Sequence, residues 1–414
     1  MSIRRLVGWF AIVTALALLT ACAGATRPAD HDVAATRRSD VPTDVPAAPP
    51  TTPPTPIGPG SAAAPASTST LESAAPAEMQ RTPPSTTAFP RTSVAAAAPP
   101  APVSTAIAAA PPPAAGPRPA NGSPTSLGRC TLFPRSSYWY ANVSTLPVHA
   151  SSAAYVASIG ATSGLKADFG SGLWNGGPIG IPYVVVGAGQ PKVSVTFDYA
   201  DESDPGPYPI PPDAPIEGGA ASDGDRHILV VDQTDCRLYE TWSTTPQGGG
   251  WHAGSGAVFD LGSNALRPDG WTSADAAGLP ILPGLVRYDE IAAGRVDHAI
   301  RITVPRTQKS FIWPARHFAS SRTDVNLPPM GLWLRLRADY DTSGFPREAK
   351  IVLDALKQHG AIVADNGSAW YLSGAPDERW NNDALATLRR VPGSAFDAID
   401  TSSLPVSAGS GQVR

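Results

Sequence analysis

The sequence predicts a mainly β domain, an antiparallel β-sandwich or jelly roll with a few peripheral helices. Residues 192–199 alternate between polar and apolar side chains, and residues 332–339 repeat the pattern, as in strands with one face toward solvent. Short apolar runs follow one another after Pro178, separated by glycine, proline and asparagine turn signals. Only one connection carries a convincing crossover helix, and this scarcity favours antiparallel pairing.

The folded domain is expected to occupy only part of the 414 residues. Of the 46 prolines, 23 lie between Ala23 and Gly128, and Phe89 is the one aromatic residue of that segment. So few large apolar side chains cannot offset the entropy of ordering the backbone. We therefore expect a signal peptide over 1–21, a disordered tether rich in proline, alanine, serine and threonine over 22–128, a β-rich domain over 129–405 and a disordered tail over 406–414.

Capping and turn residues predict the first elements of the domain. A serine at the start of residues 151–159 and a glycine just after them predict one or two helical turns. Residues 226–232 and 236–242 predict a hairpin with Thr234 at its apex, which places Glu240 opposite Ile228. Further strands are expected at 181–186, 257–261, 299–304 and 311–313.

The signals near the C-terminus are stronger. Pro346 and Gly360 bracket a helix with Val352 and Leu356 on its apolar side. Asn366-Gly367 lies between two strand-like runs and is the strongest kind of two-residue hairpin signal. A final helix is expected over 378–390.

The first residues are typical of an export signal. Arg4 and Arg5 precede an apolar run that ends at Leu19 and is too short to span a bilayer comfortably. Leu19-Thr20-Ala21-Cys22 resembles the bacterial lipobox, which implies that Cys22 is lipid-modified and becomes the first residue after cleavage. No second apolar stretch of spanning length follows. The expected location is extracytoplasmic, with the lipid anchor as the sole contact with the cell membrane or outer membrane.

Charge and motifs narrow the function classes. The net charge is -4, and lysine and arginine form no run longer than a pair, so nucleic acid is not an expected partner. The sequence has no Gly-x-Ser-x-Gly elbow, no His-Glu-x-x-His, no phosphate-binding loop and no Cys-x-x-Cys. Composition and motifs therefore name no reaction.

Cysteine usage predicts one disulfide. If lipid takes Cys22, Cys130 and Cys236 form an even remainder in an oxidising compartment. A bond between them would close a loop of roughly a hundred residues, worth about 4 to 5 kcal/mol in the chain-entropy model.

An acidic loop follows the strand over 192–199. It carries Asp201, Glu202 and Asp204, and carboxylates at the ends of adjacent strands can converge as the acid and base of a glycosidase. The same oxygens suit Ca²⁺, which takes six to eight oxygen ligands. A solvated loop that caps the sheet edge is the third interpretation, and all three stay open. No cofactor is expected other than Ca²⁺ at this loop.

Basic and buried polar residues supply further candidates. His227 follows Arg226, and His317 follows Arg316, so each imidazole has a neighbouring cation that favours its neutral form. The predicted hairpin places Glu240 among apolar residues, where burial would raise its pKa and suit a general acid. A structural role for each of these residues is the competing interpretation.

Tryptophans near glycine and proline are candidate ligand platforms. Flat side chains on loops can stack on sugar rings, although they also close the ends of sandwiches. The candidates are Trp174, Trp251, Trp271 and Trp313.

Three segments of the domain carry a resemblance. They are Tyr199-Ala200-Asp201-Glu202-Ser203-Asp204-Pro205-Gly206-Pro207-Tyr208, Gly224-Asp225-Arg226-His227 and Trp313-Pro314-Ala315-Arg316-His317. With them, residues 138–400 resemble a family of secreted bacterial proteins of unassigned activity. The resemblance implies a discrete domain, and it transfers no catalytic residue and no substrate.

The leading hypothesis is an envelope lipoprotein that binds and hydrolyses a polysaccharide or another cell-envelope glycan. Its acids and bases would be Asp201, Glu202, Asp204 and Glu240, with Arg226, His227 and His317 as orienting groups. The alternative is a non-catalytic envelope or adhesion module whose acidic loop binds calcium or only caps the sheet. A carrier of lipid or a small ligand is a third class, and it requires an apolar cavity.

Overall fold

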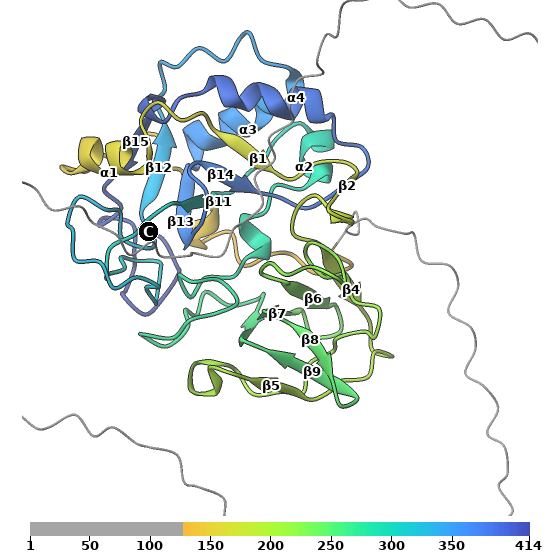
Figure 1. The fold of residues 1–414 in the computed structure, drawn as a ribbon. Helices are drawn as coiled ribbons and strands as arrows, with labels where there is room; N and C mark the ends of the chain where they lie inside the picture. Colours follow the sequence, from red (N-terminus) through yellow and green to blue (C-terminus); the bar gives the residue numbers. More distant parts are fainter. Residues whose placement is uncertain (1–126) are drawn as a thin grey trace, which may run out of the picture. The chain divides into compact units, whose positions relative to one another are not determined.

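Two sheets of unequal size dominate residues 127–414, the part of the chain that the computed structural model describes (Figure 1). The larger sheet has six strands. In spatial order they are β1 (Lys166–Asp168), β14 (Tyr371–Ser373), β11 (Ile300–Val304), β13 (Ala361–Asn366), β12 (Trp333–Leu336) and β15 (Phe396–Ile399). Two of its pairs, β1 with β14 and β11 with β13, are parallel.

The second sheet has four strands and is flanked by smaller ones. Its order is β10 (Ser255–Asp260), β7 (Arg237–Trp242), β6 (Ile228–Asp232) and β4 (Tyr183–Val186). A three-stranded sheet follows the order β5 (Val195–Phe197), β9 (Gly250–Ala253) and β8 (Thr245–Gln247). A two-stranded hairpin pairs β2 (Leu173–Trp174) with β3 (Gly177–Pro178).

Four α-helices complete the domain. They are α1 (Ser152–Ile159), α2 (Tyr288–Ala293), α3 (Arg347–Gln358) and α4 (Asn382–Ala386). Helix α3 packs against β12 and α4, and α1 packs against β15 (Figure 1). Ala349, Val352, Leu353 and Leu356 of α3 are buried at helical spacing, and Gly360 follows with φ +69°. No helix within residues 127–414 has the length and apolarity needed to cross a membrane.

Strand β6 is buried on both faces. Leu229 and Val231 belong to the large core that reaches the six-stranded sheet. Ile228 and Val230 belong to a smaller core with Tyr208 and other apolar residues around the three-stranded sheet. A strand with two buried faces is an unbroken apolar run and does not alternate, and this sequence has such a run at 228–231.

The predicted disulfide is confirmed. Cys130 and Cys236 are bonded, with their Cα atoms 5.5 Å apart. The bond fixes the start of the described chain to the turn between β6 and β7.

The prediction of a strand-rich domain with a few helices is confirmed, but the antiparallel sandwich or jelly roll is not. The domain is mixed α/β, with four small mixed sheets and no clear sandwich in residues 127–414. Parallel pairs arise here without a crossover helix in each connection, because the chain between β4 and β6 runs through loops and β5. Counting helices therefore could not reveal the parallel pairs.

The hairpin predicted at Asn366-Gly367 is wrong. Strand β11 lies between β13 and β14, and Gly367 donates a backbone hydrogen bond to Val304 at the end of β11. The turn at Asn366-Gly367 therefore connects β13 to β14 across β11, and β13 and β14 do not pair with each other.

The hairpin of β6 and β7 forms with its register shifted by one residue from the prediction. Glu240 lies opposite Leu229, because the loop between Asp232 and Arg237 holds four residues. A one-residue shift exchanges the faces of a strand. Glu240 consequently faces the large core.

Two predictions at the C-terminal end need correction. The expected helix over 378–390 starts at Asn382, because the side chain of Asn381 accepts a hydrogen bond from the Ala384 amide and caps the helix there. The expected disordered tail over 406–414 is ordered, because its backbone pairs with Ser137, Ala265 and Pro405. The predicted signal peptide, Cys22 and the tether lie outside the described residues, apart from Leu127 and Gly128.

Candidate functional site

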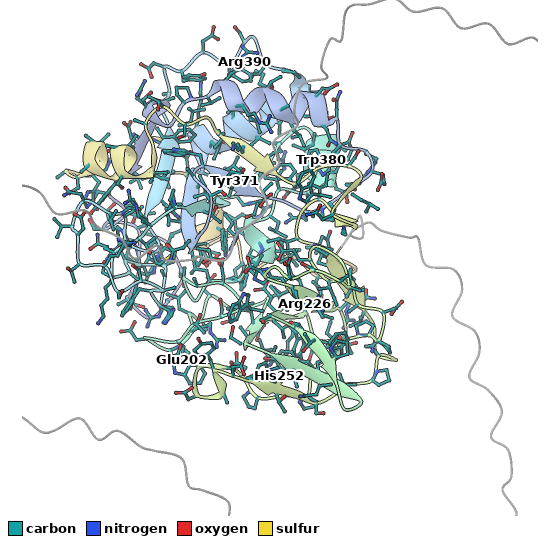
Figure 2. The ribbon with its side chains drawn as sticks, in the orientation of Figure 1. Glu202, Arg226, His252, Tyr371, Trp380 and Arg390 are labelled. Carbon is teal, nitrogen blue, oxygen red and sulfur yellow. A yellow bond between two sulfur atoms is a disulfide. The ribbon has the colours of Figure 1, made fainter. Side chains whose placement is uncertain are left out.

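A pocket with a cavity volume of about 250 Å³ lies where the six-stranded sheet meets the loop that leads into β6. Its walls come from the ends of β1, β11, β13 and β14, from loop 217–227 and from the β2–β3 hairpin. Segments far apart in the sequence thus meet at one place. Figure 2 shows Tyr371 on the side of the large sheet and Arg226 on the side of the loop.

Carboxylates outnumber cations in this pocket. The two cations in its wall are His227 and Arg301. The carboxylates are Asp168, Glu217, Asp223, Asp225 and Asp365.

Asp168 ends β1 and is partly buried. Burial raises its pKa to about 7, and the charges of Glu217 and Asp225 add to the effect while Arg301 opposes it. No hydrogen bond to the carboxyl group contributes to the balance. Asp168 therefore holds a proton that it can give up near neutral pH.

His227 and Glu217 form a charged pair in the pocket wall. Nδ1 of His227 lies 2.5 Å from Oε2 of Glu217, and Nε2 lies 3.0 Å from the carbonyl oxygen of Ala274. A carbonyl only accepts, so Nε2 carries a proton. Burial lowers the pKa of His227, but the charge of Glu217 and the hydrogen bond to it outweigh burial and raise the pKa to about 9. His227 is consequently an imidazolium at neutral pH, and it faces the carboxyl group of Glu217.

The same two residues and Asp225 form the one group within residues 127–414 whose spacing could hold a metal ion. One ligand atom from each of the three lies within 4.8 Å of the others. Three ligands fall short of the six to eight oxygens that Ca²⁺ takes. Glu217 and His227 are hydrogen-bonded to each other in this arrangement.

Arg301 lies in the floor of the pocket, and four of its five N–H groups have hydrogen-bond partners. Its guanidinium donates two hydrogen bonds of 2.8 Å to Asp275 and one of 2.8 Å to the hydroxyl of Ser373. A further contact of 3.2 Å reaches Asp365. Burial raises the pKa of Asp365, Arg301 counteracts this effect, and the charge of Asp275 adds to it. Asp275 is thus the main ion-pair partner of Arg301, because it accepts two hydrogen bonds of 2.8 Å whereas Asp365 accepts one of 3.2 Å.

Trp174 stands at the rim of the pocket on the β2–β3 hairpin, and it is 39% exposed. Asn175 and Gly176 form the turn, with φ of 49° and 87°. Positive φ at both central residues is typical of the type I′ turn that Asn-Gly favours. Asn175-Gly176 is a hairpin signal of the same kind as Asn366-Gly367, and it is the one that places Trp174.

The hairpin sits directly on loop 217–227. A Cβ atom on Gly177 would lie 2.0 Å from the carbonyl carbon of Gly218, so the two backbones are in contact. Arg226 fastens the same loop, because its guanidinium donates to the carbonyl oxygens of Thr244, Ala220 and Ser222. The guanidinium of Arg226 therefore positions the loop that carries Glu217 and Asp225.

Among the residues predicted as site residues, the structure brings His227 and Trp174 into this pocket and places Arg226 behind it. The acidic loop lies elsewhere, and Figure 2 shows Glu202 well away from Arg226 and Tyr371. Asp201 is exposed.

Two of the three carboxylates of the acidic loop already have partners. Asp204 pairs with Arg267 and accepts from the Val258 amide at 2.8 Å. Glu202 accepts from the Thr272 amide at 3.0 Å and lies 3.9 Å from Nε2 of His317. The contacts of Asp204 and Glu202 join the loop to neighbouring chain segments, as a sheet-capping role requires.

Glu240 is completely buried. Burial raises its pKa to about 7, and hydrogen bonds from the amides of Leu282 and Ile281 counteract the rise. It does not line the pocket, so its carboxylate ties β7 to residues 281–282 inside the core.

The remaining candidates are distributed over other parts of the domain. Arg316 donates to the carbonyls of Arg267 and Ala408. Trp251 is buried in the small core, Trp271 lies beside the Arg267 guanidinium, and Trp313 packs edge-on against Tyr138 and Trp333. None of these four side chains lines the pocket.

Comparisons with protein-family models, with curated proteins and with solved structures give no match to this chain. The pocket is therefore interpreted from its own residues.

Replacing Asp168 by Asn is expected to stabilise the domain at pH 8. The folded pKa of about 7 lies above the ordinary 3.8, so ionised Asp168 costs stability that increases from about pH 4 to pH 7. The variant should be more stable at pH 8 by about 1 to 3 kcal/mol and equal to the wild type at pH 4. Urea unfolding at both pH values checks this, with the exposed Asp201→Asn as control. A less stable variant at pH 8 would contradict the expectation.

Gly177→Ala is expected to detach the hairpin from loop 217–227. The new methyl group would overlap the Gly218 backbone, and overpacking of this kind costs about 1 to 3 kcal/mol. Trp174 fluorescence and the rate of proteolysis in the loop report the change. The matched control is Gly189→Ala, because nothing lies within 4 Å of a Cβ atom there. Equal behaviour of the two variants would show that the close contact is not needed.

Proposed function

We propose that the domain binds a polysaccharide in this pocket and hydrolyses it by acid–base catalysis. One observation carries the proposal: Asp168, with a pKa of about 7, shares the pocket with the carboxylate of Glu217, which faces a protonated His227. Glycoside hydrolysis uses two carboxyl groups, of which one holds a proton that it can donate near neutral pH.

The chemistry assigns one role to each carboxyl group. Asp168 gives its proton to the glycosidic oxygen as the bond between that oxygen and the anomeric carbon breaks. Glu217 acts at the anomeric carbon, either by taking the proton of the attacking water or by attacking the carbon itself. His227 donates a hydrogen bond to Glu217 and fixes the orientation of its carboxyl group.

Trp174 supports a carbohydrate as the substrate. Its exposed indole stands at the rim of a pocket otherwise rich in polar side chains, among them Asn366 and Ser368. Flat aromatic side chains cover the apolar face of a sugar ring, while amides and hydroxyls match its hydroxyl groups. This proposal keeps the substrate class expected from sequence and transfers the acid–base roles to Asp168 and Glu217.

We further propose that the domain works outside the cytoplasm and is held to a membrane through a lipid on Cys22. The Cys130–Cys236 disulfide supports an oxidising compartment. A lipid-anchored domain would encounter envelope polysaccharides directly.

Release of reducing ends from envelope and plant polysaccharides tests the proposed reaction. Asp168→Asn and Glu217→Gln should each lower kcat by about 100-fold or more while glycan binding is kept. The rate should fall as pH rises through about 7, because Asp168 loses its proton there. Glu202→Gln, outside the pocket, is the matched control and should keep activity. Glycan binding without turnover in the wild type would favour the non-catalytic envelope module.

Metabolic labelling with a fatty-acid probe tests the anchor. The wild type should be labelled and recovered with membranes, whereas Cys22→Ala should carry no label. An unlabelled wild-type protein in the cytosol would refute the proposed location.

A further inference from the structure

We infer that the glycan taken by this pocket carries free amino groups, as in a chain of deacetylated hexosamines. The inference rests on the proposed function and adds the chemical class of the sugar. It follows from a charge imbalance inside the pocket and from the way in which the two cations of the wall are already engaged.

Arg301 offers little positive charge to a ligand. Asp275 binds it through two hydrogen bonds of 2.8 Å, and Ser373 takes a third N–H group. Asp275 does not itself line the pocket, so the carboxylate that neutralises Arg301 lies outside the cavity. The second cation, His227, is paired with Glu217 at 2.5 Å.

Three carboxyl groups of the pocket form no ion pair, although Asp225 lies within 4.8 Å of His227 and shares the charge of that imidazolium with Glu217. No lysine, arginine or histidine within residues 127–414 lies in ion-pair contact with Asp168, Asp223 or Asp225. Asp223 is exposed, and Asp225 accepts a hydrogen bond of 3.3 Å from the indole of Trp242. Asp168 holds the proton that the proposed reaction needs, so the attraction for a cation comes mainly from Asp223 and Asp225. Carboxylates along the wall of a concave site attract a cationic ligand more strongly than a neutral one.

An ammonium group matches this arrangement better than a metal ion does. Asp168 comes from β1, whereas Asp223 and Asp225 come from loop 217–227, so the three carboxyl groups border the cavity from two sides. A metal ion requires ligands that converge on one point, and the one converging set includes the hydrogen-bonded pair of Glu217 and His227. An ammonium group instead donates three hydrogen bonds to acceptors around it.

Trp174 favours a sugar as the carrier of the cation. The exposed indole is part of the same wall, so one ring can lie on the indole while its amino group reaches the carboxylates. Acetylation of that amino group would remove the charge and add bulk. The pocket should therefore separate two glycans that differ in acetylation alone.

The test compares glucosamine oligosaccharides with N-acetylglucosamine oligosaccharides of equal length by calorimetry on the intact domain. We expect at least 10-fold tighter binding of the free-amine oligomers, and their affinity should fall as NaCl rises. Asp223→Asn should weaken binding of the free-amine oligomers by about 3- to 10-fold and leave the acetylated ones unchanged. Asp201→Asn removes the same charge outside the pocket, and it should change neither.

The outcomes separate this inference from the proposed function. Equal affinity for both oligomers, or hydrolysis of a neutral glycan with no preference for amines, overturns the inference and leaves glycan hydrolysis standing. Failure to bind or cleave any glycan overturns both. Retention of one divalent cation per chain, with glycan binding that is lost in EDTA, assigns the carboxylates to a metal ion and overturns the amine.

Discussion

The guanidinium of Arg301 is the interaction on which the candidate site depends. From β11 it reaches Asp275 in the segment before α2, Ser373 in β14 and Asp365 in β13. Buried charges are stable only when each has a partner, so the group forces three strands and one loop into a fixed arrangement. The floor of the pocket is the result, and Asp168 lies within range of its charge.

Local signals in the sequence predicted individual elements well. Helix α3 was predictable because a proline, a glycine and an apolar stripe define it without reference to the rest of the chain. The disulfide was predictable because two cysteines remain once Cys22 is set aside. Pairing was harder, since β4 and β6 are parallel although the connection between them has no crossover helix.

The candidate site was largely beyond sequence analysis for the same reason. Asp168, Glu217 and Asp365 are each ordinary acids in their own segments, and only the sheet order β1-β14-β11-β13 and the loop before β6 bring them together. The acidic loop at 201–204 had the denser cluster of carboxylates, but Arg267 and backbone amides occupy two of them. A dense acidic segment thus proved less informative than isolated acids that meet in the fold. His227 and Trp174 were the candidates that sequence analysis and the pocket have in common.

The position of the disulfide has a mechanical consequence. Asp168, Trp174, Glu217 and His227 all belong to the stretch between Cys130 and Cys236, which the bond closes into a ring. A force applied to the chain before Cys130 is transmitted through the disulfide to Cys236, next to the start of β7. The residues between the two cysteines are therefore not extended by that force. Tension between an anchor on that side and a glycan bound in the pocket would thus be carried by the disulfide. The arrangement of the side chains that bind the glycan would then be kept under forces that unfold a strand without such a bond.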